Sequence, residues 1–409
     1  MTHIWQGLRS GEWVTAARMR GYSLILLGLF VLVFAGWIAV SDGLISSNGQ
    51  PIGTDFSNVY AAGTLTWQGR AADAYAPALQ HAAEKAVFDG SDVPFYGWHY
   101  PPFFFAVAVL VAAVPYAWGL ALWLVTSFAA YLAAIRAVVP RHETWLVAAA
   151  FPAVFVNIGH GQNGFLTAAL LGGALHWLDR RPWLAGVLIG LLAYKPQLGV
   201  LIPVALLAGG RCRTIGAAAA TVAALVAISF AMLGSGIWQA FADSMNFTQT
   251  VVLEQGGTGW QKIQSIFSAV RACGANVPTA YAAQASLFAM LAASLAWLWH
   301  SDVAFELKAA ALALGCLLAT PYVLDYDLVV LAVAIAFFAR HGLRHGFRDF
   351  EISLLAAAWI VPLLSRSVAG VTYIPLALLV ELAFFGVVLR RAVLDRASHA
   401  PSAPGVAQA

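Results

Sequence analysis

Runs of about 17–20 uncharged, mostly apolar residues recur along the whole chain, and this feature limits its fold more than any other. A helix of that length spans the hydrocarbon core of a bilayer, where every backbone polar group must find a partner within the protein. Charged residues make up only 10% of the chain and hydrophobic residues 61%, whereas a soluble domain carries about 25% charge. The sequence therefore predicts an all-α polytopic membrane protein.

The apolar segments predict about twelve transmembrane helices. These segments lie near residues 21–40, 118–135, 144–157, 163–178, 183–194, 197–208, 214–233, 281–299, 304–319, 328–339, 352–364 and 371–389. Residues 103–114 are apolar too, but counting them as a crossing would place Arg136 and Arg141 on the outer side. They are therefore predicted to be re-entrant or part of a bent pair. Residues 1–397 are expected to form one transmembrane domain, and residues 398–409 a disordered cytoplasmic tail.

Clusters of Lys and Arg in the short connections indicate orientation, because such residues accumulate on the cytoplasmic side. The clusters fall in residues 1–20, 136–141, 180–181, 211–213, 340–348 and 390–391. Both termini are then cytoplasmic, in what is predicted to be a bacterial inner membrane. Two long loops, residues 41–99 and 234–280, face outward. Helical spacing in the first loop predicts two short interfacial helices, one through Phe56, Val59, Tyr60 and Gly63, the other through Leu79, Ala82, Ala83 and Val87.

Polar and ionisable residues that are unusual for a membrane protein gather on the predicted outer side. Such residues are costly at membrane depth and mark functional cavities when several converge. The set comprises Asp55, His99, Tyr100, His160, Gln162, Asn163, Lys195, Gln197, Trp260, Lys262, Tyr322, Asp325 and Asp327. The net charge of +3 does not indicate nucleic acid binding, and three cysteines far apart in sequence indicate neither a disulfide nor a metal site.

Lys195 and the acidic residues each allow two interpretations. Lys195 lies between apolar runs beside the helix-breaking Pro196, so it either binds a phosphate or pairs with Asp325 or Asp327. Asp55 precedes a predicted helix, where it is either an N-cap or a catalytic base. Asp325 and Asp327 form a base, a metal-ligand pair or the capped start of the next helix, and capping is expected for one of them.

The remaining polar residues are weighed in the same way. His99 and His160 either contact a ligand or make local hydrogen bonds at helix ends, and Gln162 and Asn163 either satisfy a turn or bind sugar. Among the tryptophans, most of which suit the membrane interface, Trp260 lies in a glycine-rich outer loop and is the candidate for stacking on a sugar.

Five short motifs in this order resemble the bacterial membrane glycosyltransferases of family 87, which include polyprenyl-phosphate-mannose-dependent mannosyltransferases. The motifs are Asp55-Phe56-Ser57-Asn58-Val59-Tyr60, Tyr100-Pro101-Pro102, Gly161-Gln162-Asn163-Gly164, Lys195-Pro196-Gln197, and the stretch from Thr320-Pro321-Tyr322 to Asp325-Tyr326-Asp327. The resemblance implies a GT-C-type fold with Asp55 as the base. In several relatives a His follows the late Asp, whereas Tyr326 stands here.

The function implied by the resemblance is transfer of a hexosyl, in particular mannosyl, group from a polyprenyl-phosphate donor to an envelope glycolipid or glycan, with inversion and with neither cofactor nor metal. Lys195, His160 and Lys262 are then expected at the donor phosphate. Tyr60, Tyr100, Gln162, Asn163, Gln197, Trp260, Tyr322, Asp325 and Asp327 are expected to line the substrate pocket. The alternatives are a multi-pass transporter or lipid flippase, in which Lys195 and the late aspartates form an ion relay, and a structural envelope subunit.

Overall fold

The computed structural model describes residues 2–399, and within them all regular structure is helical. Within these residues, six helices have more than 20 residues: α2 (Ala16–Ala39), α6 (Tyr116–Val138), α13 (Cys212–Leu233), α16 (Val277–His300), α19 (Glu351–Thr372) and α20 (Leu376–His399). Two shorter helices also run through the bundle: the buried α17 (Phe305–Leu318), and α18 (Leu331–His345), which follows the 3₁₀ turn η6 (Asp325–Val330).

Shorter helices fill the middle of the bundle. They are α7 (Glu143–Ala149), α8 (Pro152–His160), α9 (Gly164–Trp177), α10 (Pro182–Leu191) with η3 (Leu192–Tyr194), α11 (Pro196–Gly199) and α12 (Ile202–Ala208). Three of them begin at a proline, Pro152, Pro182 or Pro196. Proline suits the first position of a helix because its missing N–H would have no partner there, and it ends the helix before it.

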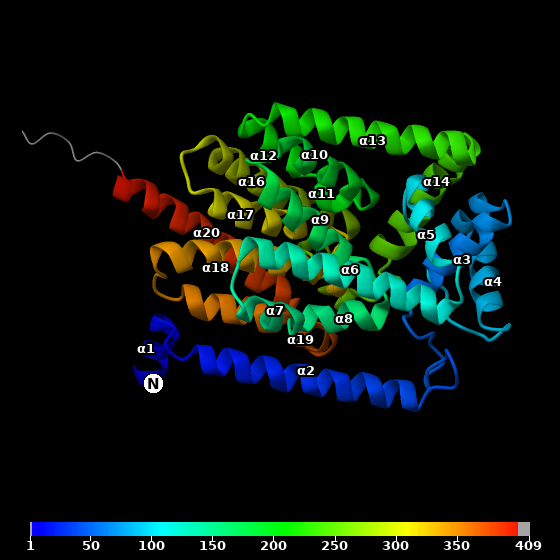
Figure 1. Ribbon diagram of the computed structural model, residues 1–409, viewed down its shortest axis with the longest axis horizontal. Helices are drawn as coiled ribbons and strands as arrows, with labels where there is room; N and C mark the ends of the chain where they lie inside the picture. Colours follow the sequence, from blue (N-terminus) through cyan, green and yellow to red (C-terminus); the bar gives the residue numbers. More distant parts are fainter. Residues whose placement is uncertain (1, 400–409) are drawn as a thin grey trace, which may run out of the picture.

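The bundle has a buried centre and two peripheral rods. In the 18-residue apolar stretch of η6 and α18, 78% is buried inside the protein, whereas the corresponding stretches of α2 and α13 are 6% and 11% buried. Helix α17 is buried along almost its whole length and packs against α18, α16 and α20. In Figure 1, α13 lies along one side of the molecule and α2 along the opposite side, with the other long helices between them.

All-α architecture and membrane helices are confirmed, and the predicted segments correspond to helices of the structure with shifted bounds. Among residues 2–399, six helical segments are long and apolar enough to cross a membrane: Ala16–Ala39, Tyr116–Val138, Cys212–Leu233, Val277–His300, Asp325–His345 and Glu351–Thr372. The crossing expected at 144–157 is instead α7 and α8, broken before Pro152, and α19 extends past the predicted end at 364 to Thr372. Twelve crossings therefore remain a prediction.

The two ends of the bundle differ in composition. One end, here called the terminal end, carries α1 (Thr2–Ser10) and the last turns of α20, as Figure 1 shows. Arginines predicted to lie on one side of the membrane meet there in ion pairs: Arg9 with Asp349 at 2.7 Å, Arg344 with Glu306 at 2.6 Å and Arg348 with Asp395 at 2.9 Å. Their grouping agrees with the charge pattern of the connections.

The opposite end, here called the loop end, is built by the two long loops. The first loop holds α3 (Phe56–Trp67), η1 (Ala71–Tyr75) and α4 (Pro77–Val87), so both predicted short helices are present. Most of α3 is buried against α4 and α5, and its position at the membrane interface stays a prediction. The apolar run 103–114 forms η2 (Pro102–Phe104) and α5 (Phe105–Val111), and seven residues of α-helix rise only about 10 Å, too little to cross.

The second loop covers the first. It contains α14 (Gly236–Phe247), the π-helical segment η4 (Thr248–Glu254), η5 (Trp260–Lys262) and α15 (Ile266–Ala272). Phe95 contacts Phe247, and His99 Nδ1 lies 2.7 Å from the Thr248 hydroxyl. At the other terminus, α20 continues to His399, and the rest of the tail predicted from residue 398 lies outside the described residues.

Candidate functional site

The turn between α8 and α9 is pressed against the start of α3. Gly161 ends α8 in the left-handed conformation with φ 61°, and a Cβ there would lie 2.6 Å from Phe56 Cβ and 2.8 Å from Gly53 O. Only glycine fits this contact without strain. The Trp123 indole N–H donates to the Gly161 carbonyl at 3.1 Å, so the turn is fixed from both sides and carries its neighbours His160 and Gln162 to Asp55.

Asp55 stands at the beginning of α3 with its carboxylate turned toward this turn. Its side chain makes no capping hydrogen bond to the helix, so the N-cap interpretation is wrong. Instead, Asp55 Oδ2 accepts a hydrogen bond from Gln162 Nε2 at 3.0 Å and lies 3.8 Å from His160 Nδ1. The side chain is 18% exposed, and Oδ1 has no hydrogen bond within residues 2–399. One carboxylate oxygen is thus held and the other is free to accept a proton.

Gln162 is itself held by buried partners. Its Oε1 accepts from the Tyr100 hydroxyl at 3.2 Å and from the Asn163 backbone N–H at 3.1 Å, while Asn163 Nδ2 donates to the Tyr100 hydroxyl at 2.7 Å. Asn157 Nδ2 donates to the Gln162 carbonyl at 2.9 Å. The predicted residues Tyr100, Gln162 and Asn163 are therefore brought together as a framework that orients Asp55, with Gln162 as the member that reaches it.

A group of cationic side chains, Arg366 and Lys262, here called the cationic cluster, lies on the other side of His160. The Thr54 hydroxyl is 3.0 Å from His160 Nδ1, and Arg366 Nη1 is 3.4 Å from His160 Nε2 and 3.4 Å from Asp325 Oδ2. Because a guanidinium can only donate, His160 Nε2 is the acceptor in this contact. The Arg366 side chain is 45% exposed, against 3% for Asp325, so most of its donors remain open.

Arg366 was missing from the residues selected by sequence. It follows the segment 352–364 at the end opposite the arginine clusters, and this departure from the charge pattern was the signal that could have identified it. The helix that carries it, α19, is longer than predicted, which brings Arg366 beside α8.

Lys195 forms a buried ion pair beneath the cluster. Its Nζ lies 2.5 Å from Asp327 Oδ1, with side-chain exposures of 5% and 2%. Asp327 Oδ2 accepts from the Leu324 N–H at 3.1 Å, so Asp327 also caps the start of η6 as expected for one of the two aspartates. Lys195 Nζ is 4.9 Å from the centre of the Tyr326 ring, and the His160 ring lies 5.7 Å from that ring between centres. These contacts favour the ion-pair interpretation of Lys195.

Lys262 approaches the same place from the second loop. Ile263 and Leu324 form an isolated antiparallel bridge, and the Gln264 N–H donates to the Val323 carbonyl at 2.9 Å. Ser365 also hydrogen-bonds Gln264. This docking places the charge of Lys262 within electrostatic range of Asp325. No acidic group pairs with the partly buried Lys262 in the described part of the chain.

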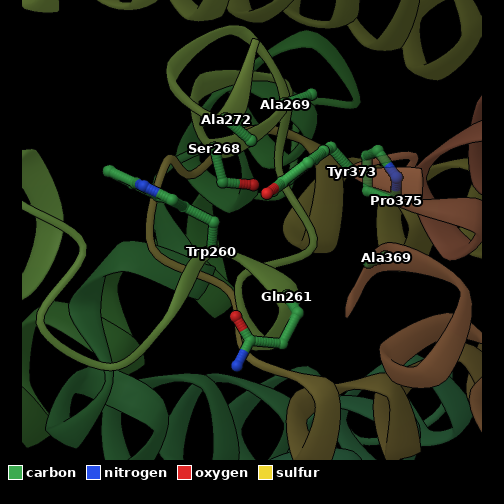
Figure 2. A pocket seen from close by; sticks show the side chains of 8 residues that line it. All are labelled: Trp260, Gln261, Ser268, Ala269, Ala272, Ala369, Tyr373 and Pro375. Carbon is green, nitrogen blue, oxygen red and sulfur yellow. The ribbon is translucent and has the colours of Figure 1, made fainter. Parts of the chain in front are cut away.

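Trp260 lies against a separate hollow. Figure 2 shows this hollow between Trp260, Gln261, Ser268 and Tyr373, with Ser268 and Tyr373 facing one another. Its volume is about 10 Å³, room for about one water molecule and too little for a sugar. The Arg271 guanidinium lies 5.6 Å from the indole centre, and the backbone at Gly256 packs closely on the same ring. Stacking of a sugar on Trp260 stays a prediction.

Three other predicted pocket residues lie at the margins of this arrangement. The Tyr60 hydroxyl donates to the Val114 carbonyl at 2.9 Å, and its ring packs on Tyr116. Gln197 lies in α11, two residues beyond Lys195, and is partly buried. Tyr322 packs with Trp260 and Leu324, and burial raises the pKa of its hydroxyl.

The groups around Asp55 differ in charge from one flank to the other. His160, Arg366 and Lys262 supply positive charge or hydrogen-bond donors on one flank. On the flank formed by the first loop, Glu84, Tyr96 and His99 all lie within electrostatic range of Asp55. Burial lowers the pKa of His99 to about 4, so His99 is neutral at pH 7. The first-loop flank therefore offers neutral hydrogen-bonding and aromatic groups.

The protein is thus a helical bundle with several membrane-length helices, and its candidate site is a half-free carboxylate beside cationic side chains. The chain matches glycosyltransferase family 87 over residues 98–321, more than half of its length, and it belongs to that family. It is accordingly a membrane glycosyltransferase, which decides against the transporter alternative. Neither a curated protein nor a solved structure matches the chain. Tyr100, His160, Gln162 and Lys195 fall inside the matched region, whereas Asp55, Asp325 and Arg366 fall outside it.

Proposed function

We propose that the protein transfers a hexosyl group, in particular mannosyl, from a polyprenyl-phosphate donor to an envelope glycolipid or glycan, with inversion. The observation that carries this proposal is the half-free carboxylate of Asp55 next to His160 and to the cations Arg366 and Lys262. A glycosyl phosphate ester needs these two elements side by side: a base for the acceptor hydroxyl and positive charge for the leaving phosphate.

In the proposed reaction, the acceptor hydroxyl oxygen attacks the anomeric carbon from the face opposite the phosphate, and its proton passes to Asp55 Oδ1. The bond from the anomeric carbon to the phosphate oxygen breaks, and the polyprenyl phosphate leaves with the electron pair. Arg366 and Lys262 offset the charge that develops on this phosphate, with His160 between them and the base. Inversion follows from a single displacement.

The two flanks of Asp55 support a different binding position for the donor and for the acceptor. The donor phosphate is drawn to the cationic flank, while the neutral Tyr96 and His99 flank suits the hydroxyls of an acceptor sugar. We further propose that the protein lies in a bacterial inner membrane with the loop end facing outward and both termini in the cytoplasm. The support is the gathering of arginines at the terminal end, where Arg9, Arg344 and Arg348 lie in ion pairs.

The test is transfer of labelled mannose from synthetic polyprenyl-phosphate mannose into membrane glycolipid by purified protein, with and without EDTA. Asp55→Asn retains an oxygen that accepts from Gln162 but cannot take a proton, so we expect a folded protein with transfer reduced at least a hundredfold. Asp73→Asn in the same loop is the matched control, since Asp73 pairs with Arg70 away from the site. An active Asp55→Asn protein would refute the role of Asp55, and loss of transfer in EDTA would require a metal.

A further inference from the structure

The first loop contains buried polar atoms that have no hydrogen-bond partner. They belong to residues of α3, of α4 and of the segment that follows: Ser57 Oγ, Asn58 Oδ1, Gln80 Oε1, Glu84 Oε1 and Trp98 Nε1. Buried polar side chains nearly always find partners, so five such atoms in one loop need an explanation. The site described above uses none of them.

Gln80 and Glu84 form the centre of this group. Both are fully buried and lie one turn apart on the same face of α4. Gln80 Nε2 donates to the Asn58 carbonyl at 3.0 Å, which leaves Gln80 Oε1 as an acceptor, and Glu84 Oε2 accepts from the Tyr96 N–H at 3.0 Å. Two acceptor oxygens, Gln80 Oε1 and Glu84 Oε1, therefore remain without a donor. A proton on the carboxyl would supply that donor.

The surroundings of Glu84 do not favour its charged form. The ionisable groups that face it are Asp55 at the start of α3, Tyr96 on the following segment and Tyr116 at the start of α6. None of these is a cation. On its own helix, Lys85 pairs with Asp92 at 2.6 Å and His81 bonds the Val93 carbonyl at 2.7 Å. Burial raises the pKa of Glu84 to about 8 and outweighs hydrogen bonding to the carboxylate, which lowers it, while the nearby charge of Asp55 adds to the rise.

We propose that Glu84 is a protonated carboxylic acid in the folded protein and donates its O–H to Gln80 Oε1. This bond holds the Gln80 side chain where its Nε2 reaches the Asn58 carbonyl, and so fixes α4 to α3. It also leaves Asp55 as the one charged carboxylate on that flank. Glu84 is then a positioning residue for the base. Its ionisation would break the contact with Gln80 and bury a second negative charge near Asp55. The role at Asp55 rests on the proposed function, whereas the protonation of Glu84 does not.

The pH dependence follows from the direction of this pKa shift. An unfolded glutamate titrates near 4.3, and the folded Glu84 near 8, so between these values the folded state binds one more proton than the unfolded state. The ratio of folded to unfolded protein therefore falls by up to about tenfold per pH unit across this range and is constant above it. Transfer should fall as pH rises through about 8, because the positioned form is lost.

The first experiment compares wild type, Glu84→Gln and Glu84→Ala in the purified full chain without substrate, by melting midpoint from pH 5 to 9. Glutamine keeps a neutral donor and an acceptor, so we expect Glu84→Gln to fold well. Its melting midpoint should increase relative to that of wild type as pH rises to 8. Exposed Glu143→Gln is the matched control and should follow wild type. An infrared difference spectrum at pH 7 should show a protonated-carboxyl band in wild type that is lost in Glu84→Gln.

These readouts keep the two proposals apart. Absence of that band, or a Glu84→Gln midpoint lowered as far as that of Glu84→Ala at every pH, would mean that Glu84 is charged in the fold and would overturn the inference. Transfer from polyprenyl-phosphate mannose is measured next over the same pH range, where Glu84→Gln should remain active above pH 8 and wild type should not. If wild type transfers no sugar at any pH, the proposed function fails while the melting and infrared results still decide the state of Glu84.

Discussion

Replacing Lys195 by methionine separates the two roles that the sequence left open for this residue. The Lys195 ammonium and the Asp327 carboxylate are 2.5 Å apart, and their side chains are 5% and 2% exposed. Removing one partner of such a pair strands the other charge, at a cost of about 3–5 kcal/mol. Methionine conserves the length of the lysine stem, so packing contributes little to the loss. We therefore expect Lys195→Met to lower the free energy of unfolding by roughly this amount.

A double-mutant cycle isolates the pair from other effects. Asp327→Asn should also destabilise the protein, because it leaves the ammonium unpaired, yet the asparagine oxygen can still accept from the Leu324 N–H. The double variant should recover most of the loss, with a coupling energy of about 3 kcal/mol. The assay is unfolding in mixed micelles with increasing SDS, followed by tryptophan fluorescence. Lys262→Met is the matched control, since Lys262 has no acidic partner among the described residues and its loss should leave stability unchanged.

The two interpretations of Lys195 predict opposite results. If Lys195→Met folds as stably as wild type while its KM for the polyprenyl-phosphate donor rises, Lys195 contacts phosphate and the ion-pair argument fails. If stability falls and Lys262→Met instead raises the donor KM, the pair is structural and the phosphate is bound by Lys262 and Arg366.

Three further predictions concern the turn at α8 and the cluster beside it. Gly161→Ala should destabilise the protein by roughly 2–5 kcal/mol, because it adds a Cβ at φ 61° and 2.6 Å from Phe56 Cβ; a melting midpoint equal to that of wild type would contradict the close approach. Tyr100→Phe leaves Asn163 Nδ2 without its acceptor at a cost of about 1–3 kcal/mol, and transfer should fall because Gln162 is less well held, as measured in the same preparation. Arg366→Gln should lower kcat/KM for the donor roughly tenfold or more while the acceptor KM stays constant, and an equal change in both would place Arg366 outside the phosphate site.

The helices were predictable because their causes are local. Apolar run length sets the rods, and proline sets the beginnings of α8, α10 and α11. The ends of the rods were less predictable, since α19 continues to Thr372 through polar residues that find partners in the fold: Ser365 bonds Gln264, and Arg366 reaches Asp325. The spacing predicted helix α3 but not its burial beneath α4 and α5, because such tertiary packing is absent from a local pattern.

The structure brings together several of the residues that the sequence singled out, but their individual partners could not be predicted. Asp55, Tyr100, His160, Gln162 and Asn163 were selected because polar residues are rare in such a chain, and the structure joins them in one hydrogen-bonded network. Which cation pairs with which acid depends on ångström distances between distant segments. Lys195 therefore pairs with Asp327 while Asp325 receives Arg366, a residue that the sequence analysis passed over.

The boundary of the family match gives the hydrogen bond between Gln162 and Asp55 a particular importance. The match covers residues 98–321 and so includes the framework of Tyr100, Gln162 and Asn163, with His160, but neither Asp55 nor Asp325. Asp55 joins that framework through Gln162 Nε2 at 3.0 Å and His160 Nδ1 at 3.8 Å. If Asp55 is the base of the family reaction, the framework exists to hold it, and changing Gln162 should matter only while Asp55 is present. Gln162→Leu should therefore reduce transfer in wild type and cause no further loss in Asp55→Asn, whereas an additional loss in the double variant would show that Gln162 acts on the substrate directly.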